Sequence, residues 1–453
     1  MSATDLSRTT TDAHDAPITV DPAEEKAVVR RAMLKIIPFL FFLYVIAYLD
    51  RVNVSFAKLQ MNDLPWFNDE IYGLASGIFF IGYFIFEVPS NLILQRVGAR
   101  VWIARIMFTW GLIAMAMVLV NSPMVFYIMR FLLGAAEAGF FPGVLLYLTF
   151  WFTLRERARA VAFFMTANAV TFTLGGPLSG WLMQHELFGL RGYQTMFLLE
   201  GFPAVLMTGV VLWYLPNGPR DARWLSEREK RILTQRLEDE QGATHEHGSL
   251  MEALREPKVW LLCAVFFFLV TGMYGIGLWI PQLIKDMSAG LNEVQVGFLT
   301  AIPYLVSGTV MVINAIHSDS TGERRLHVTI PAIIGAIGFI GYAFNDKNPT
   351  MALLCLTIAA SGMWAILGPF WSLPPLALRT GTALAAGLAF INSVGNLGGF
   401  IGPYVVGAIK NNLGEASANV GVAFFLAGCV FIGAILALFA PTQKTNLIRS
   451  EGI

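Results

Sequence analysis

The stretch from Ile36 to Phe56, IIPFLFFLYVIAYLDRVNVSF, decides the fold of this chain. It is almost wholly apolar and long enough to cross a bilayer, whose core of roughly 30 Å needs about 20 helical residues. It nevertheless carries Asp50 beside Arg51, although charged side chains inside a bilayer are costly and therefore usually functional. We expect a membrane-spanning helix that contains a functional pair of ionisable groups.

The composition of the whole chain agrees with a membrane protein. Of its 453 residues 56% are hydrophobic and 14% are charged, whereas an average soluble domain has about 25% charged residues. The net charge is zero, which gives no indication of a nucleic-acid partner. The sequence has no phosphate-binding loop, no nucleophile elbow and no His or Cys cluster with metal-ligand spacing. We therefore expect a protein of the lipid bilayer that is no enzyme and has neither a metal nor an organic cofactor.

Twelve apolar runs are long enough to span the membrane. They start near Ile36, Ile71, Val101, Met124, Ala158, Gln194, Lys258, Gln295, Leu326, Met351, Ala383 and Val420. A long polar segment separates the first six from the last six. The sequence thus predicts an all-α membrane protein, with a disordered cytoplasmic tail (1–33), a six-helix half (34–215), a cytoplasmic linker (216–257), a second six-helix half (258–440) and a cytoplasmic tail (441–453).

The distribution of basic residues predicts the orientation, because Lys and Arg accumulate in cytoplasmic loops. With a cytoplasmic N-terminus, most of the basic residues fall on the cytoplasmic side. Only five remain outside: Lys58, Arg191, Lys285, Lys347 and Lys410. We expect a multi-pass protein of the cell (inner) membrane with both termini in the cytoplasm, and we expect it to be a monomer.

An internal repeat relates the two halves. The fifth run contains Gly176-Pro177 with Gly180, and the eleventh contains Gly402-Pro403 with Gly407. Basic turns with a glycine, 95–100 and 319–325, follow the second and eighth runs. Two parallel copies of a six-helix unit commonly enclose a substrate site between them, near the middle of the membrane.

Helical geometry separates the two charges of the first run. Arg51 shares a face with Tyr48, whereas the neighbouring Asp50 points about 100° away. On the fourth run, Arg130 and Glu137 lie seven residues apart and near one face. We expect Asp50 to pair with Arg130, which leaves Arg51 and the tyrosine to line a cavity and to bind a carboxylate.

Buried carboxyl groups suggest proton coupling, since an ion pair that breaks and re-forms can load and release a proton. We assign this role to Asp50 and Glu137, with a permanent structural ion pair as the alternative. We interpret Glu87 as structural, paired with a loop arginine, and Glu200 as structural too. On the eleventh run, Asn392 and Asn396 lie one turn apart and suit contact with a polar substrate; these candidates are all read from the sequence.

Several motifs resemble the anion:cation symporter family of the major facilitator superfamily. They are YLDRVN at 48–53, Arg130 followed by EAGFFPG at 137–143, and GNLGG at 395–399. The run from Phe84 to Arg105 and the start of the linker, ARWL at 222–225, are most similar to the bacterial tartrate-transporter and 4-hydroxyphenylacetate-permease branches.

The resemblance implies proton-driven uptake of a small organic anion such as tartrate, 4-hydroxyphenylacetate or a sugar acid, with the proton as coupling ion. It assigns proton transfer to the matching Asp50 and Glu137, and carboxylate binding and the charge network to Arg51 and Arg130. The matching substrate contacts are Tyr48, Tyr83 and either Asn392 or Asn396. Asn168 is also a candidate, although sugar-acid transporters of the family carry glutamine there. An anion exchanger or uniporter with the same cavity, or a transporter-like ligand sensor, remains an alternative.

Overall fold

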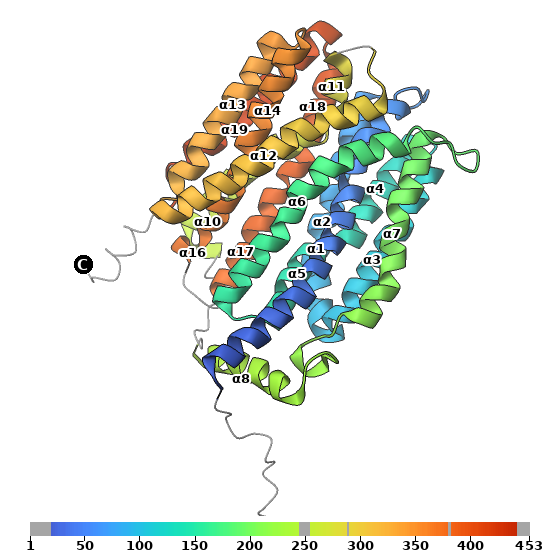
Figure 1. Ribbon diagram of the computed structural model, residues 1–453. Helices are drawn as coiled ribbons and strands as arrows, with labels where there is room; N and C mark the ends of the chain where they lie inside the picture. The colour runs from blue at the N-terminus through green and yellow to red at the C-terminus, as the bar shows by residue number, and fades with distance from the viewer. Residues whose placement is uncertain (1–19, 244–253, 288–289, 379–381, 442–453) are drawn as a thin grey trace, which may run out of the picture.

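The computed structural model describes residues 20–243, 254–287, 290–378 and 382–441, and every long element in these ranges is a helix. The first half of the chain forms one bundle (Figure 1). Its helices are α1 (Pro22–Met61), α2 (Asp69–Val97), α3 (Ala99–Ala116), α4 (Pro123–Glu137), α5 (Phe140–Thr149), α6 (Leu154–Leu182) and α7 (Gly192–Tyr214). A linker helix, α8 (Glu227–Ala243), follows.

The second half forms a matching bundle beside the first (Figure 1). Its helices are α10 (Pro257–Gly277), α11 (Ile280–Met287), α12 (Glu293–Thr321), α13 (Arg325–Asn345), α14 (Pro349–Ala365), α15 (Leu367–Trp371), α16 (Pro374–Ala377), α17 (Thr382–Asn396), α18 (Gly398–Asn412) and α19 (Glu415–Ala437). Within the described ranges, eleven spans are long and apolar enough to cross a membrane. The consecutive helices α17 and α18 supply the remaining crossing, which confirms the predicted all-α, twelve-span architecture.

The first helix begins earlier than the sequence analysis predicts. The Asp21 side chain accepts a hydrogen bond of 2.9 Å from the Ala23 N–H, Pro22 occupies the first turn, and Glu24 and Glu25 follow. A side-chain cap, a proline at the first position and acidic residues in the first turn all favour a helix start. The prediction of disorder over 1–33 is therefore wrong from Pro22 onward, and residues 1–19 and 442–453 lie outside the described ranges.

Four of the crossings consist of two consecutive helices. Between α4 and α5, Gly139 has φ +87°, and a Cβ there would lie 2.1 Å from Ser90 Oγ. Only glycine satisfies both the positive φ and the close approach. The interruption follows Glu137 directly, so this carboxylate lies at the end of its helix.

The two bundles meet most closely at the end of the molecule where α1 ends, here called the far end; the opposite end, which carries α8, is the linker end. Helices α6 and α12 cross with their backbones in contact (Figure 1). A Cβ on Gly297 would lie 2.4 Å from the Gly176 carbonyl oxygen. The Tyr72 hydroxyl also donates to the Leu278 carbonyl at 2.5 Å across the halves. The far end is thus closed in this conformation.

We expect Gly297→Leu to prevent this closure, because the added side chain has no space against α6. Ser55 is 2% exposed and lines a small cavity together with Gly176. The change is measured with a cysteine introduced at Ser55, in a variant from which the three native cysteines have been removed. In detergent, Gly297→Leu should increase its labelling by a maleimide several-fold. The control is Gly209→Leu, where a Cβ meets no described atom within 4 Å; equal labelling in the two variants would contradict the prediction.

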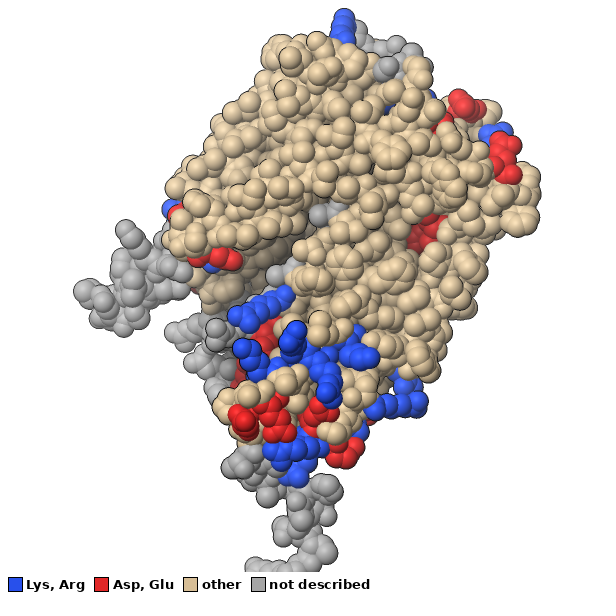
Figure 2. Space-filling view, in the orientation of Figure 1, with Lys and Arg blue, Asp and Glu red and all other residues tan. Residues whose placement is uncertain are grey.

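Charged side chains gather at the linker end, and a broad band with few charged side chains separates them from a smaller charged group at the far end (Figure 2). Helix α8 binds the first bundle there through ion pairs. Arg31 contacts Glu229 at 2.6 Å, and Arg236 contacts Glu156 at 2.7 Å. Exposed pairs of this kind each contribute about 0–1 kcal/mol. Helix α8 is therefore attached to the first half of the chain.

Candidate functional site

Arg51 is the centre of a buried polar cluster between the two halves. Its side chain, on α1, forms an ion pair with the Glu137 carboxylate on α4. It also donates to the Tyr48 hydroxyl at 3.4 Å and to the Tyr274 hydroxyl of α10 at 3.3 Å. The predicted association of Arg51 with the tyrosine is confirmed. Tyr274 is only a weaker candidate from the sequence, because aromatic side chains of membrane helices are more often packing residues, and here it contacts Arg51.

A close helix crossing brings Glu137 to Arg51. A Cβ on Gly134 would lie 2.0 Å from the Phe79 carbonyl oxygen, so α4 packs directly on the backbone of α2. The same crossing places the Tyr83 ring 5.4 Å from the Arg51 guanidinium carbon. A small residue at such a position permits close packing within a membrane. The glycine therefore sets the spacing of the charged groups.

Asp50 points away from this cluster, as predicted, but its partner is not Arg130. Its carboxylate accepts a hydrogen bond of 2.8 Å from Trp110 Nε1 and a longer one of 3.4 Å from the Asn53 side chain. Arg130 instead lies over the Phe79 ring, 4.8 Å from the guanidinium carbon to the ring centroid. The predicted pair is wrong because Asp50 faces α3, whereas Arg130 faces α2.

Glu87 also differs from its predicted role. It forms no ion pair with a described arginine; instead its carboxylate accepts hydrogen bonds from Asn392 at 2.8 Å and from Ser393 at 3.2 Å. Both donors lie on α17, because Glu87 faces the second half of the molecule. Glu200, by contrast, stays within the first half and accepts a hydrogen bond of 2.7 Å from Ser179. Its interpretation as a structural residue remains a prediction.

The other candidates come from both halves of the molecule. Asn168 on α6 is buried, and its Oδ1 atom has no hydrogen-bond partner among the described residues. Asn392 bonds to Glu87, whereas Asn396 makes no side-chain hydrogen bond in the part of the chain described. Two aromatic rings form a wall across the halves, since Phe172 stacks on Tyr304 with 4.5 Å between ring centroids. The roles of the three asparagines in substrate binding remain predictions.

Two atoms of the Arg51–Glu137 pair lack protein partners. Arg51 Nε and Glu137 Oε2 are buried and unpaired with respect to the described residues. A buried donor without a partner is destabilising by about 1–3 kcal/mol. The guanidinium therefore has a free N–H group for a further anionic acceptor, in addition to the atoms that contact Glu137.

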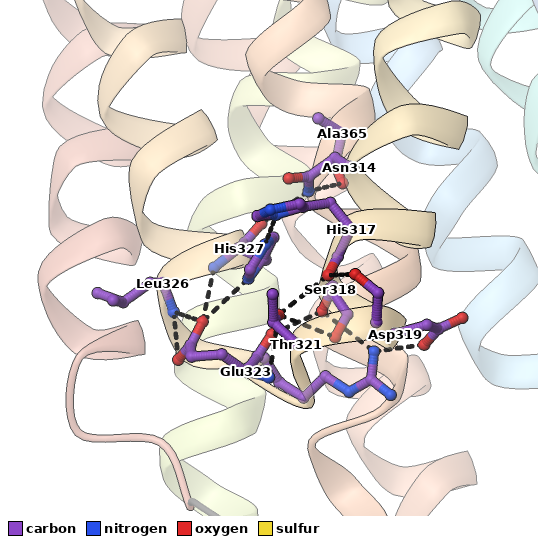
Figure 3. Close-up of polar contacts among 11 residues, drawn as sticks. Asn314, His317, Ser318, Asp319, Thr321, Glu323, Leu326, His327 and Ala365 are labelled. Carbon is purple, nitrogen blue, oxygen red and sulfur yellow. Dashed lines mark hydrogen bonds and ion pairs between the residues drawn. The ribbon is translucent and has the colours of Figure 1, made fainter.

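A second polar cluster lies in the turn between α12 and α13 (Figure 3). Glu323 accepts hydrogen bonds from the Leu326 N–H at 2.9 Å and from His327 at 3.0 Å, and His327 lies 2.7 Å from His317. Burial raises the pKa of Glu323, but these hydrogen bonds outweigh it and leave the pKa below its ordinary value. The cluster borders a groove of about 820 Å³ between α12, α13 and α14. It fixes the turn and is separate from the Arg51 cluster.

The described residues contain no group of three or more His, Cys, Asp or Glu side chains that could hold a metal ion. What the site offers is a guanidinium, two carboxylates, hydroxyls and amides, enclosed between two bundles. Two six-helix halves around such a site define a membrane transport protein.

Comparison with known proteins identifies the family. The family model of the Major Facilitator Superfamily matches residues 40–403, and the chain belongs to this superfamily. It is a multi-pass transport protein and not an enzyme.

Relatives are similar over almost the whole length. A protein of Agrobacterium vitis named for tartrate transport is 46% identical over 94% of each chain. The Escherichia coli (strain K12) "Inner membrane transport protein RhmT" is 36% identical, over 92% of this chain and 96% of that protein. A crystal structure of a D-xylose-proton symporter has a TM-score of 0.72 at 18% identity, over 91% of this chain and 98% of that one. The last comparison shows likeness of fold alone.

Proposed function

We propose that this protein is a proton-coupled symporter that takes up a small organic carboxylate. The observation that carries the proposal is the ion pair between Arg51 and Glu137, because the same guanidinium is the group best suited to bind a substrate carboxylate. Glu137 and an anionic substrate therefore compete for Arg51. Protonation of Glu137 releases the guanidinium, and the substrate carboxylate then binds in its place.

The cycle follows from this competition. A proton and the substrate enter together, since only the protonated Glu137 leaves Arg51 to the anion. Loss of the proton on the other side of the membrane restores the internal ion pair and displaces the substrate. Tyr48 and Tyr274, whose hydroxyls already accept from Arg51, turn toward the substrate as donors. Arg130 keeps a positive charge near the site, and Asp50 is the second proton-carrying group.

The relatives support the substrate class. The similarity to a protein named for tartrate transport favours an organic acid, and more narrowly a hydroxylated one. The unpaired Asn168 Oδ1 atom could accept a hydrogen bond from a substrate hydroxyl. Asn392 and Asn396 would contribute amides from the second half.

The orientation proposed from the sequence places the linker end in the cytoplasm. The charged side chains at that end support this assignment (Figure 2), because cytoplasmic segments are rich in basic residues. The similarity to a protein named for the inner membrane supports the location. The closed far end then faces outward.

We expect an imposed pH gradient, alkaline inside, to drive accumulation of a radiolabelled carboxylate in proteoliposomes. The gradient should raise the accumulation ratio about tenfold per pH unit for each coupled proton at zero membrane potential. A thermal-shift screen against a panel of carboxylates selects the substrate. Uptake that is equal with and without the gradient would contradict symport. Counterflow without any response to pH would instead identify an exchanger or uniporter.

A further inference from the structure

Glu87 is a carboxylate of the membrane interior that the proposed cycle does not use. Glu87 is buried, with 3% of its surface exposed. One oxygen accepts from Asn392 at 2.8 Å and the other from Ser393 at 3.2 Å, and both donors belong to the opposite half of the protein. No cation among the described residues pairs with it. Glu87 is thus held entirely by neutral donors across the interface.

This arrangement repeats that of Glu137. In both cases a carboxylate of the first half occupies donors that we assign to the substrate: Arg51 for Glu137, and the Asn392 amide for Glu87. The two lie in one site, because Tyr83, one turn before Glu87 on α2, lies against the Arg51 guanidinium. The site therefore holds two internal carboxylates, each bound as a substrate carboxylate would be.

We infer that Glu87 occupies the place of the second carboxylate of a dicarboxylate substrate and carries one additional proton, beyond those of Glu137 and Asp50, when that substrate displaces it. The inference rests on the proposed function. One substrate carboxylate binds Arg51 and releases Glu137; the other binds the Asn392 amide and the Ser393 hydroxyl and releases Glu87. Each released carboxylate takes one proton from water. The two negative charges of the dianion are balanced by the two protons on Glu137 and Glu87.

Desolvation explains why displacement and protonation occur together. A buried carboxylate that loses its donors is strongly destabilised while it is ionised, so Glu87 is released only in its protonated form. A monocarboxylate needs only the Arg51 position, and Glu87 then keeps its partners on α17. The number of coupled protons thus depends on the number of substrate carboxylates.

Tartrate and glycerate test this inference as a matched pair, since glycerate is tartrate with one carboxylate replaced by hydrogen. The full-length protein and Glu87→Gln are compared in proteoliposomes, with the potential set by potassium and valinomycin. We expect Glu87→Gln to lower the tartrate accumulation ratio about tenfold per unit of pH gradient, the contribution of one proton. In Glu87→Gln, tartrate uptake should also carry one more negative charge per cycle than in the wild type. The number of protons taken up with each glycerate should be the same in Glu87→Gln and in the wild type.

The outcomes separate this inference from the proposed function. If Glu87→Gln takes up as many protons with each tartrate as the wild type does, the inference is overturned. The symporter is still supported in that case, provided that the wild type shows pH-driven uptake. Absence of pH-driven uptake of both acids by the wild type overturns the symporter itself. A purely structural link would alter thermal stability and counterflow rates for both acids equally and leave the proton count unchanged, which also overturns the inference.

A second variant keeps the test decisive if Glu87→Gln does not fold. Replacing both donors, Asn392→Ala with Ser393→Ala, should weaken tartrate binding at least tenfold relative to glycerate. The dissociation constants are measured by thermal shift of the purified protein. Equal weakening of the two acids would overturn the inference, because these donors would then not recognise the second carboxylate.

Discussion

Replacing Glu137 with glutamine should lower pH-driven accumulation by the contribution of one proton while counterflow exchange continues. Glutamine does not titrate, so it neither carries a proton nor holds Arg51 in a charged pair. For a gradient of one pH unit, the accumulation ratio should fall about tenfold for the lost proton. Carboxylate binding should become tighter at neutral pH and less sensitive to pH. In the wild type it should strengthen as the pH falls, because protonated Glu137 releases the guanidinium.

The matched control for this prediction is Glu200→Gln. Glu200 is another buried glutamate of the first half, but its hydrogen bond goes to Ser179 and not to a cation. We expect this variant to keep the response to the pH gradient. A full response in Glu137→Gln would show that the Arg51 ion pair is structural, which is the alternative that the sequence left open.

Replacing Arg51 with lysine should weaken substrate binding by about 10- to 100-fold, or roughly 1.4–2.8 kcal/mol. Lysine retains the charge opposite Glu137, so the fold survives, but it lacks the planar fork that recognises a carboxylate with two N–H groups. It also cannot reach Glu137 and the hydroxyls of Tyr48 and Tyr274 at once, as the guanidinium does. The loss should appear in the dissociation constant measured by thermal shift.

Arg105→Lys is the control for a change from arginine to lysine outside the site. The Arg105 guanidinium carbon lies 3.9 Å from the centroid of the Trp102 ring, on α3, and contacts none of the candidate substrate residues. We expect its substrate affinity to match the wild type. Equal affinities of Arg51→Lys and the wild type would remove Arg51 from the substrate site.

The sequence was sufficient for the fold and for the different directions of the Asp50 and Arg51 side chains. Apolar runs of the right length predict the spans, and the 100° step of the helix separates adjacent side chains. The partners of these charges could not be predicted, since they depend on how helices rotate against one another. Arg130 and Trp110 lie on different helices, and nothing local in the sequence says which of them faces Asp50.

The contacts of Glu87 and Tyr274 could not be read from the sequence for the same reason. Each contacts a residue more than 200 positions away, across the interface between the halves. The internal repeat predicts that such an interface exists, but not its register. A glycine-rich surrounding, as in TGMYGIG at 271–277, is the one local sign that Tyr274 lies where helices approach closely.

The crossing of α6 and α12 at the far end has a mechanical consequence. Its contacts at Gly176, Gly180, Glu293 and Gly297 run between backbone atoms, and the Phe172–Tyr304 stack lies one helical turn from Gly176. Two helices that touch through backbone atoms can separate and pack again with few changes of side-chain conformation at the contact. The glycines therefore allow α6 and α12 to separate and to pack closely again, as a repeated transport cycle would require.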